Sequence, residues 1–385
     1  MVKKYDFLLF ENFYRAVNHN KDVDIIAGFL TELGYEVAIV DVCPLNQYHF
    51  IEGIPVLQTT HQFRPLKGRS KLLPERLCNI LDDYCWNWHL HKVMKEMKGR
   101  YNHLYVGSYY TKMIPIWFRD IPKTSSVFFW GLRSFWLQEY KYSHSLRSVN
   151  SYFLYRMVKD SKNLKFFVSD ENIKKEFLDL GIEPGRLVLR YERFVKEMPP
   201  ARTYNSVACK FLSIGSLRRD KRIERIANAL KNVSMPYQYV IAGKSAGNYE
   251  AEIEKAIAGN SSITRMNKRL SEEEFNDLMD TSSYLVLCDV RPPSCVTNGT
   301  MNEALLKGMP IIAPNYNPYK SAVEEYGVGL LFAPNEEGAL QKALEKAIEL
   351  GPSAFSKGIV KYQQTLLYET VLNAFNRDLK ESLKA

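Results

Sequence analysis

The stretch YLVLCDVRPPSCVTNGTMNEALLKGMPIIAPN, residues 284–315, decides the fold. It opens with an apolar run at 284–288 followed by a proline-rich loop, a pattern that predicts a buried strand. A helix is predicted to begin near Thr300 and to end at Gly308, before a second apolar strand at 309–313. A strand that leads through a loop into a helix N-terminus forms a place where anions bind. This stretch is therefore the candidate anion site.

The start of this helix supplies four candidate residues. Thr300 and Glu303 stand three residues apart, which predicts a capping box in the first turn. Asn298, Gly299 and Thr300 are candidate ligand-binding residues because the backbone N–H groups of a helix N-terminus point at a bound anion. Glu303 is either the cap partner of Thr300 or a ligand contact, and one carboxylate can serve both purposes.

Length and composition are those of an ordinary globular protein with room for two domains. The chain has 385 residues, 46% hydrophobic and 25% charged. It contains no run of the roughly 18 apolar residues that a membrane helix needs, and Asp6 and Glu11 interrupt the N-terminal apolar run, so we expect no signal peptide. The six cysteines and seven histidines show no metal-ligand spacing, and we expect neither a metal nor a cofactor.

Positive charge is concentrated in the first half of the chain. Residues 1–200 carry 29 Lys and Arg against 22 Asp and Glu, so they hold +7 of the formal +9. Such a surface attracts an anionic partner, which can be a phosphorylated acceptor, a membrane surface or nucleic acid, and a plain solvated surface remains the alternative. The basic residues show no regular interleaving with aromatics, so we expect no nucleic-acid partner.

The first half alternates apolar strand-like runs with helical periods, and this pattern predicts a doubly wound parallel sheet over residues 1–198. The loop at 11–21 lacks the GxGxxG pattern of dinucleotide binding. Gly131 and Arg133 follow the apolar run at 126–130. Because open α/β sheets bind ligands at the carboxyl ends of their strands, these two residues are candidates for the acceptor side.

A second alternation begins after the proline-containing linker at 196–204, and it predicts a second domain over 199–365. A strand ends at Gly215, and the loop that follows carries Arg218, Arg219, Lys221 and Arg222. Cations between a strand end and a helix start suit a pyrophosphate, although a solvated basic loop is the alternative reading. Gly243-Lys244 repeats the arrangement after the next strand. A final helix, 366–385, is expected to pack back toward the first domain.

Read together, these segments resemble the GT-B glycosyltransferases, specifically the nucleotide-sugar-dependent glycosyl transferases group 1 (family four). The resemblance runs from about residue 166 to 350. Its pieces are FFVSDENIKKEFLDLGIEPGRLVL, FLSIGSLRRDKRIERIANAL, YVIAGK, RLSEEEFNDLMDTSSYLVL and NEALLKGMPIIAPN, in the order of the family. The resemblance implies two Rossmann-like doubly wound domains, an α/β architecture with a deep interdomain cleft and a crossing C-terminal helix.

The resemblance also implies roles for individual residues. Lys221 falls on the lysine that holds the donor pyrophosphate, and Glu303 falls on the second glutamate of the E-x7-E motif, which contacts the donor ribose. The first glutamate of that motif falls on Cys295, and the family arginine falls on Ser216, where Arg218 or Arg219 is the nearest replacement. The implied catalytic residues are therefore Lys221, Glu303 and Arg218, and the donor-binding set is Gly215, Arg219, Gly243, Lys244, Asn298, Gly299 and Thr300.

The implied activity is transfer of a hexosyl group from a UDP or GDP sugar to a glycan or lipid-linked acceptor, in cell-surface polysaccharide synthesis. The resemblance implies a retaining reaction, and no metal is needed where cations and a helix dipole neutralise the diphosphate. Two alternatives stay open: a catalytically impaired homologue that acts as a binding or partner subunit, and a nucleotide-sugar epimerase. We expect a cytoplasmic protein with peripheral contact at the cytoplasmic membrane face.

Overall fold

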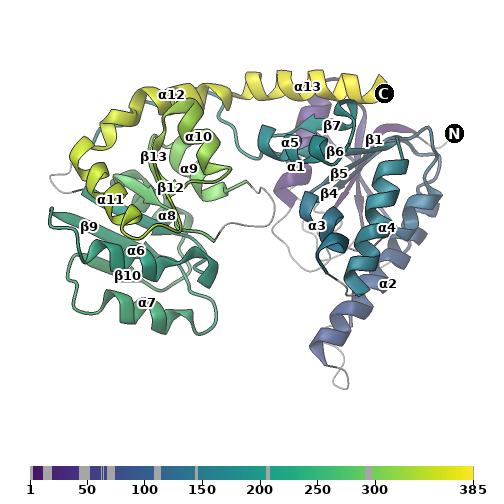
Figure 1. Ribbon diagram of the computed structural model, residues 1–385. Helices are drawn as coiled ribbons and strands as arrows, with labels where there is room; N and C mark the ends of the chain where they lie inside the picture. Colours follow the sequence, from purple (N-terminus) through teal and green to yellow (C-terminus); the bar gives the residue numbers. More distant parts are fainter. Residues whose placement is uncertain are drawn as a thin grey trace. The chain divides into compact units, whose positions relative to one another are not determined.

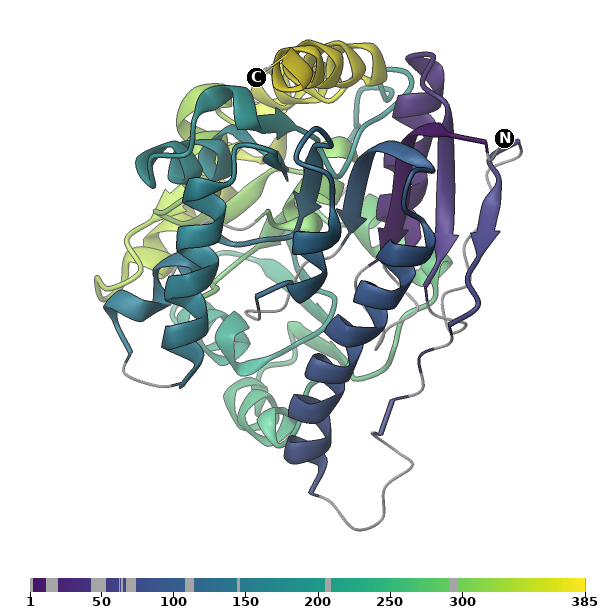
Figure 2. The same ribbon diagram turned by 90° about the vertical axis from the view of Figure 1, so that its right-hand side faces the viewer.

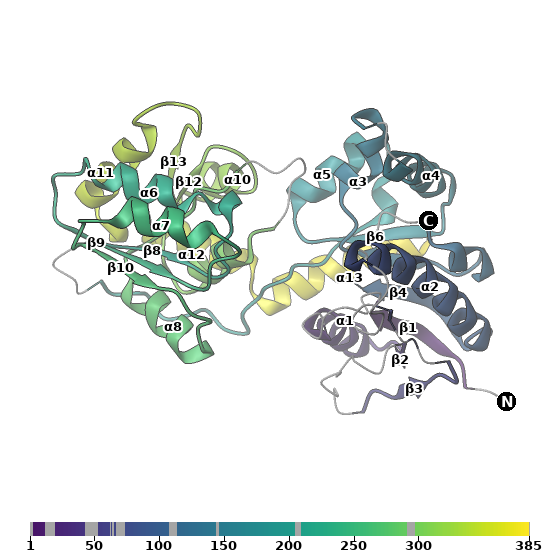
Figure 3. The same cartoon turned by 90° about the horizontal axis from the view of Figure 1, so that it is seen from below.

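The computed structural model describes residues 3–11, 20–42, 53–61, 63, 65–66, 74–107, 114–143, 146–204, 209–290 and 297–384. These residues divide into two compact units. Unit 1 is Met1–Arg190 with Leu372–Ala385, and unit 2 is Tyr191–Val371. The sequence prediction divided the chain at 198/199 and 365/366. The two units are shown as ribbons in Figure 1 and, turned about two axes, in Figures 2 and 3.

Unit 1 contains a seven-stranded parallel sheet in the order β3-β2-β1-β4-β5-β6-β7. The strands are β1 (Tyr5–Glu11), β2 (Val37–Asp41), β3 (Val56–Gln58), β4 (Tyr101–Gly107), β5 (Val127–Trp130), β6 (Leu164–Val168) and β7 (Leu187–Leu189). The helices are α1 (Asn20–Glu32), α2 (Glu75–Glu96), η1 (Ile116–Asp120), α3 (Ser134–Gln138), η2 (Glu139–Lys141), α4 (Leu146–Asp160), α5 (Glu171–Asp179) and η3 (Pro184–Arg186).

Helices cover both faces of this sheet because its strands are apolar on both sides, and rings from alternate strand positions pack on opposite faces. On one face Phe167 contacts Phe375 of α13 (Tyr368–Lys384), and Phe29 of α1 contacts the same ring. On the other face the ring of Phe166 contacts that of Phe177 in α5. The strand order reverses between β1 and β4, and right-handed crossovers therefore place α1 on one face and α2 and α4 on the other.

The C-terminal part of α13 is fixed to unit 1 by polar contacts as well as by Phe375. Its Asp378 carboxylate accepts from Lys174 Nζ at 3.0 Å and from the Leu189 backbone N–H at 3.2 Å. Lys165 Nζ donates to the Ser382 backbone carbonyl at 2.8 Å. The last residues of the chain thus complete the core of the unit that contains the first residues.

Unit 2 contains a six-stranded parallel sheet in the order β10-β9-β8-β11-β12-β13. The strands are β8 (Cys209–Ile214), β9 (Tyr237–Ala242), β10 (Ile263–Met266), β11 (Tyr284–Val286), β12 (Ile311–Pro314) and β13 (Gly329–Phe332). The helices are η4 (Arg219–Lys221), α6 (Ile223–Leu230), α7 (Tyr249–Ile257), α8 (Glu272–Thr281), α9 (Gly299–Leu306), α10 (Tyr319–Tyr326), α11 (Ala339–Leu350), η5 (Pro352–Phe355) and α12 (Ser356–Thr365). The predicted fold class, two Rossmann-like doubly wound α/β domains, is confirmed.

Local sequence explains why these helices form where they do. α6 buries Ile223, Ile226, Ala227 and Leu230, the i, i+3, i+4, i+7 spacing of one helix face. Ser271 caps α8 in a capping box with Glu274. The strand order of unit 2 reverses between β8 and β11, so the carboxyl ends of these two strands form the switch point where open α/β sheets bind ligands.

Candidate functional site

The carboxyl ends of β8 and β9 approach each other at two glycines. Gly215 and Gly243 have φ angles of 107° and 129°, values that side chains rarely permit. A β-carbon on Gly243 would lie 1.8 Å from the carbonyl oxygen of Gly215, so a side chain cannot fit there. A β-carbon on Gly215 would lie 3.9 Å from Thr300 Oγ1. The strand end and the start of α9 are therefore neighbours, as the sequence interpretation requires for a shared anion site.

The N-terminus of α9 is capped by Asn298, and the predicted capping box between Thr300 and Glu303 is wrong. Asn298 Oδ1 accepts from the Met301 backbone N–H at 3.0 Å, which makes Asn298 the N-cap and Gly299 the first helical residue. Asn is a preferred N-cap because its short side-chain oxygen reaches a free N–H of the first turn. Thr300 lies within that turn.

Glu303 instead forms an ion pair with a residue that the sequence interpretation did not select. Arg193 Nε donates to Glu303 Oε1 at 2.7 Å, and both side chains are partly exposed. Arg193 lies directly after the end of unit 1, in the segment that opens unit 2. The pair holds the carboxylate one helical turn from the N-terminus of α9.

The basic loop after β8 is less cationic than its sequence suggests, because two of its arginines have acidic partners. Arg218 donates to both carboxylate oxygens of Asp220, at 3.1 and 3.0 Å, and Arg219 pairs with Glu252. The hydrogen bond from Arg218 lowers the pKa of Asp220, and the same bond raises the pKa of Arg218. Both arginine side chains are more than half exposed.

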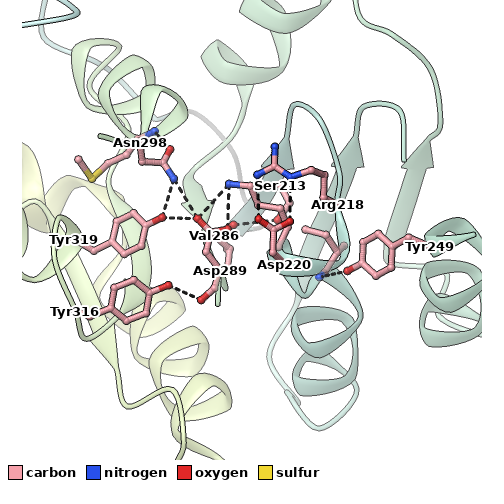
Figure 4. A network of polar contacts seen from close by, with 12 residues as sticks. Ser213, Arg218, Asp220, Tyr249, Val286, Asp289, Asn298, Tyr316 and Tyr319 are labelled. Carbon is pink, nitrogen blue, oxygen red and sulfur yellow. Dashed lines mark hydrogen bonds and ion pairs between the residues drawn. The ribbon is translucent and has the colours of Figure 1, made fainter. Parts of the chain in front are cut away.

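Lys221 is the most enclosed of the predicted cations in this loop, and it contacts Asp289, which is labelled with its other partners in Figure 4. Its Nζ lies 3.1 Å from each carboxylate oxygen of Asp289, which follows β11 and has a side chain only 12% exposed. Asn298 Nδ2 donates to the same carboxylate at 3.2 Å, and Tyr319 Oη donates to it as well. The N-cap of α9 and the lysine thus share one carboxylate.

Two tyrosines complete this network, Tyr316 from the β12–α10 connection and Tyr319 from the first position of α10. Tyr316 Oη donates to the Asp289 backbone carbonyl, and Asn298 Nδ2 lies 2.7 Å from Tyr319 Oη. Burial raises the pKa of Tyr319, and the neighbouring Asp289 carboxylate raises it further. The phenol therefore stays protonated and acts as a donor. The Oδ2 atom of Asp289 accepts from Lys221, Asn298 and Tyr319, whereas Oδ1 is buried and accepts no hydrogen bond, so the carboxylate holds Lys221 beside α9 mainly through one oxygen.

The structure thus brings part of the predicted donor set together at the β8–β11 switch point. Lys221 and Asn298 share the Asp289 carboxylate, and Gly215 lies beside Thr300 and packs against Gly243. Lys244 follows Gly243 and has an exposed side chain, while its backbone carbonyl accepts from Leu217 N–H at 3.1 Å. Arg218 and Arg219 lie on the same loop as Lys221, and their guanidinium groups are engaged with carboxylates. The assignment of roles to these residues stays a prediction.

The predicted acceptor-side residues lie in unit 1, at the carboxyl end of β5. Gly131 has a φ angle of 84°, and Arg133 lies 5.6 Å over the ring of Trp136. Next to them, the buried Arg190 guanidinium lies 4.2 Å from the Trp130 ring and donates to Asp22 Oδ1 at 2.7 Å. The loop at 12–19 and Cys295 lie outside the residues that the structure describes.

Sequence reasoning missed Asp289, Arg193, Tyr316 and Tyr319. The sequence pattern could have indicated Asp289, because it is an acidic residue directly after a buried apolar strand at the switch point. No sequence pattern indicated the other three residues, because their contacts join segments far apart in the chain. In the described part of the chain, no group of three or more His, Cys, Asp or Glu residues is arranged to hold a metal ion. Among the described helices, none is long and apolar enough to cross a bilayer.

Comparison with solved structures defines the fold class. The lipopolysaccharide outer core galactosyltransferase WaaB is similar over 97% of this chain and 99% of its own, at 12% identity and a TM-score of 0.67. WaaG, a glycosyltransferase involved in lipopolysaccharide biosynthesis, is similar over 97% of this chain and 98% of its own, at 15% identity and a TM-score of 0.63. Anabaena Alr3699/HepE in complex with UDP-glucose is similar over 98% of this chain and 99% of its own, at 13% identity and a TM-score of 0.65. The fold is that of the GT-B glycosyltransferases.

Within this class, residues 202–362 match the model of the family described as Glycosyl transferases group 1. The match covers most of unit 2 and includes all the predicted donor-side residues. No curated protein sequence matches the chain. The predicted resemblance to the group 1 glycosyl transferases with the GT-B fold is thereby confirmed.

Proposed function

We propose that the protein transfers a hexosyl group from a UDP sugar to a glycan or lipid-linked acceptor in cell-surface polysaccharide synthesis. The observation that carries the proposal is the convergence of Lys221, the bare backbone at Gly215 and the N-terminus of α9 on one strand edge. UDP is preferred to GDP because a GT-B neighbour has been solved with UDP and with UDP-glucose.

The chemistry that this site would supply is electrostatic. As the bond between the anomeric carbon and the leaving oxygen breaks, negative charge grows on the diphosphate. Lys221 would neutralise that charge from one side, and the N–H groups of Gly299 and Thr300 would do so from the helix end. The open space in front of Gly215 would let the phosphates approach the backbone. The proposed reaction uses these groups without a metal and retains the anomeric configuration.

In the proposed reaction Glu303 would contact the donor ribose. Its carboxylate is one turn into α9 and is oriented by the bidentate-capable guanidinium of Arg193. A carboxylate held in this way can accept from two vicinal hydroxyls of a ribose. Arg193 is then a positioning residue, because it acts through Glu303.

A transfer assay tests the proposal. Purified protein is incubated with radiolabelled UDP-glucose or UDP-galactose and a mixture of glycan and lipid-phosphate acceptors, and released UDP is measured. We expect UDP release that depends on acceptor and falls at least about a hundredfold in Lys221→Ala, since loss of one preorganised charge costs about 2.7–4 kcal/mol of barrier. UDP release that does not depend on the acceptor, or full activity in Lys221→Ala, contradicts the proposal.

A second candidate function, a binding or partner subunit without catalysis, is favoured by one observation. Lys221 is held by Asp289, so its charge is already neutralised before a donor arrives. If the Lys221–Asp289 ion pair persists when a donor binds, the protein binds a nucleotide sugar without catalysing transfer. Asp289→Asn separates the two candidates. Faster UDP release in this variant than in wild type indicates an enzyme that is limited by the Lys221–Asp289 ion pair. Nucleotide binding without UDP release in both proteins indicates the binding subunit.

A further inference from the structure

Most of the exposed large apolar side chains of unit 1 lie on two parallel helices, α2 and α4. Of the fourteen large hydrophobic residues exposed in the described chain, five lie on α2 and three on α4. On α2 they are Leu77, Ile80, Leu81, Tyr84 and Trp88, with a helical spacing that puts them on one face. On α4 they are Val149, Tyr152 and Phe153. Apolar residues gathered in this way mark an interaction surface.

The residue types change in order along the helix axis. Reading α2 from its N-terminus, the exposed face is first aliphatic (Leu77, Ile80, Leu81), then aromatic (Tyr84, Trp88) and finally cationic (Lys92, Lys95). The exposed face of α4 runs from Val149 through Tyr152 and Phe153 to Arg156 and Lys159, and the exposed Asp160 at its end pairs with Arg156. This order of aliphatic, aromatic and cationic groups matches the depth profile of a bilayer from hydrocarbon through the interface to the anionic headgroups.

The acidic residues of α2 do not oppose this charge pattern. Within 77–96, where the structure describes the side chains, Asp82 is buried and accepts from the Leu66 backbone N–H at 2.7 Å. Glu96 accepts from Thr60, and Asp83 is half-buried. Between residues 77 and 96, the exposed face of α2 therefore presents lysines without exposed carboxylates, which is complementary to an anionic lipid surface and not to a second copy of this basic unit.

Geometry places the aliphatic end where it can enter a membrane. α2 has 22 residues and is about 33 Å long, whereas the seven-residue β4 that follows spans about 23 Å. The turn between them is short, so the C-terminal end of α2 is flush with the start of β4 and its N-terminal end projects by about 10 Å beyond the carboxyl edge of the sheet. Figure 2 shows this projection of the dark blue helix. Leu77 to Tyr84 spans about 10 Å along the axis, which suits insertion to the headgroup–acyl boundary.

We propose that the projecting ends of α2 and α4 form a docking surface for an anionic membrane. The surface is defined by Leu77, Ile80, Leu81, Tyr84 and Trp88 of α2 and Val149, Tyr152 and Phe153 of α4. It lies at the same strand edge as Gly131 and Arg133, so docking brings a lipid-linked acceptor to the acceptor side of the sheet. The inference rests on the proposed function only in naming that acceptor; the membrane contact itself stands on the two helix faces.

Vesicle sedimentation of the full chain tests this surface. The probes are phosphatidylcholine vesicles with and without phosphatidylglycerol, at low and high salt. We expect binding only to the phosphatidylglycerol vesicles, and we expect Ile80→Glu/Leu81→Glu to lower the partition coefficient at least roughly tenfold. Lys92→Glu/Lys95→Glu should lower it to a similar extent by removing the electrostatic attraction. The matched control is Leu350→Glu/Val360→Glu, which changes two exposed apolar residues of unit 2 and should bind as wild type does.

Three results would overturn the inference. The first is wild-type protein that stays in the supernatant with phosphatidylglycerol vesicles. The second is equal binding by wild type and Ile80→Glu/Leu81→Glu. The third is a wild-type dimer in light scattering that this double variant converts to a monomer, which would assign the surface to a second copy of the chain. UDP titration of every variant separates this inference from the proposed function, because unchanged UDP affinity with lost vesicle binding leaves the donor site intact.

Discussion

The carboxyl edges of the two sheets differ in the groups that they carry. In unit 2 this edge carries two close-packed glycines, a capped helix N-terminus and an enclosed lysine, all of which suit a compact anion. In unit 1 the corresponding edge carries aromatic rings, the buried Arg190 and the projecting apolar end of α2. One doubly wound architecture therefore presents glycine backbone and an enclosed cation at the strand edge of unit 2, and aromatic and apolar side chains at that of unit 1.

This difference also explains why the donor side is easier to recognise. A diphosphate needs backbone N–H groups and cations at fixed places, and such places require glycines and lysines at fixed spacings. An extended acceptor is bound by side chains from many segments, which leave no compact pattern. The family match follows this division, since it covers residues 202–362 and does not extend into unit 1.

The largest effect is expected from closing the gap between the two glycines of unit 2. In Gly243→Ala the new β-carbon would meet the Gly215 carbonyl oxygen, and the positive φ adds strain, so the free energy of unfolding should fall by more than about 3 kcal/mol. Urea denaturation followed by circular dichroism measures it. Gly247→Ala is the control: it also has a positive φ but open space around it, and it should lose only about 1 kcal/mol.

Removing the enclosed cation should give the next largest effect. Lys221→Ala is expected to weaken UDP binding by about tenfold to a hundredfold, because a hydrogen bond to a charged group contributes about 1.5–3 kcal/mol. Calorimetric titration measures the dissociation constant. Lys231→Ala removes an exposed lysine at the C-cap of α6, at the end of that helix far from the strand edge, and should leave the dissociation constant unchanged. Equal weakening by both substitutions would show only a general effect of net charge.

Glu303→Gln should distinguish a ribose contact from a structural pair. The Arg193–Glu303 pair is partly exposed, so its loss should change the free energy of unfolding by less than about 1 kcal/mol. Affinity for UDP should fall several-fold, whereas affinity for pyrophosphate, which has no ribose, should stay the same. Parallel titrations with the two ligands test this. Equal loss for both ligands would move Glu303 from the ribose to the phosphates.

The smallest effect concerns the exposed arginine loop. The pKa of Asp220 is lowered by Arg218, so this pair stabilises the folded state above the ordinary carboxyl pKa, and the stabilisation is lost as the pH falls through the lowered value. Arg218→Ala should therefore lower the urea midpoint slightly at pH 7, and the difference from wild type should vanish in strong acid. A difference that persists in acid would mean that Arg218 stabilises the loop by packing.

The sequence was sufficient for the alternation of strands and helices, because that alternation follows from local patterns. The anion site at the strand edge of unit 2 follows from local patterns as well and stays a prediction. Gly215, Lys221 and Asn298 could be selected since each occupies a defined place between a strand end and a helix start. Asp289 was within reach of the same reasoning. The Arg193–Glu303 pair and the tyrosines of the Asp289 network were not, since each joins segments far apart in the chain.

Wrong and untested predictions have physical reasons as well. The Thr300–Glu303 capping box failed because Asn298, two residues earlier, is the stronger cap and takes the first-turn N–H. The positive charge of the loop was overestimated because Asp220 pairs with Arg218 and Glu252 pairs with Arg219. Glu252 lies on α7, far from the loop in the sequence. Sequence spacing shows which charges are close along the chain, but not which partner the fold brings to them.

The central claim is that the β8–β11 edge of unit 2 binds a nucleoside diphosphate through Lys221 and the N-terminus of α9. Calorimetric titration of UDP into wild-type protein and Lys221→Ala tests it most directly. The account predicts saturable binding to wild type with a dissociation constant in the millimolar range or below, and markedly weaker binding to the variant. No detectable heat of binding to correctly folded wild type, or equal affinity in the two proteins, would contradict it.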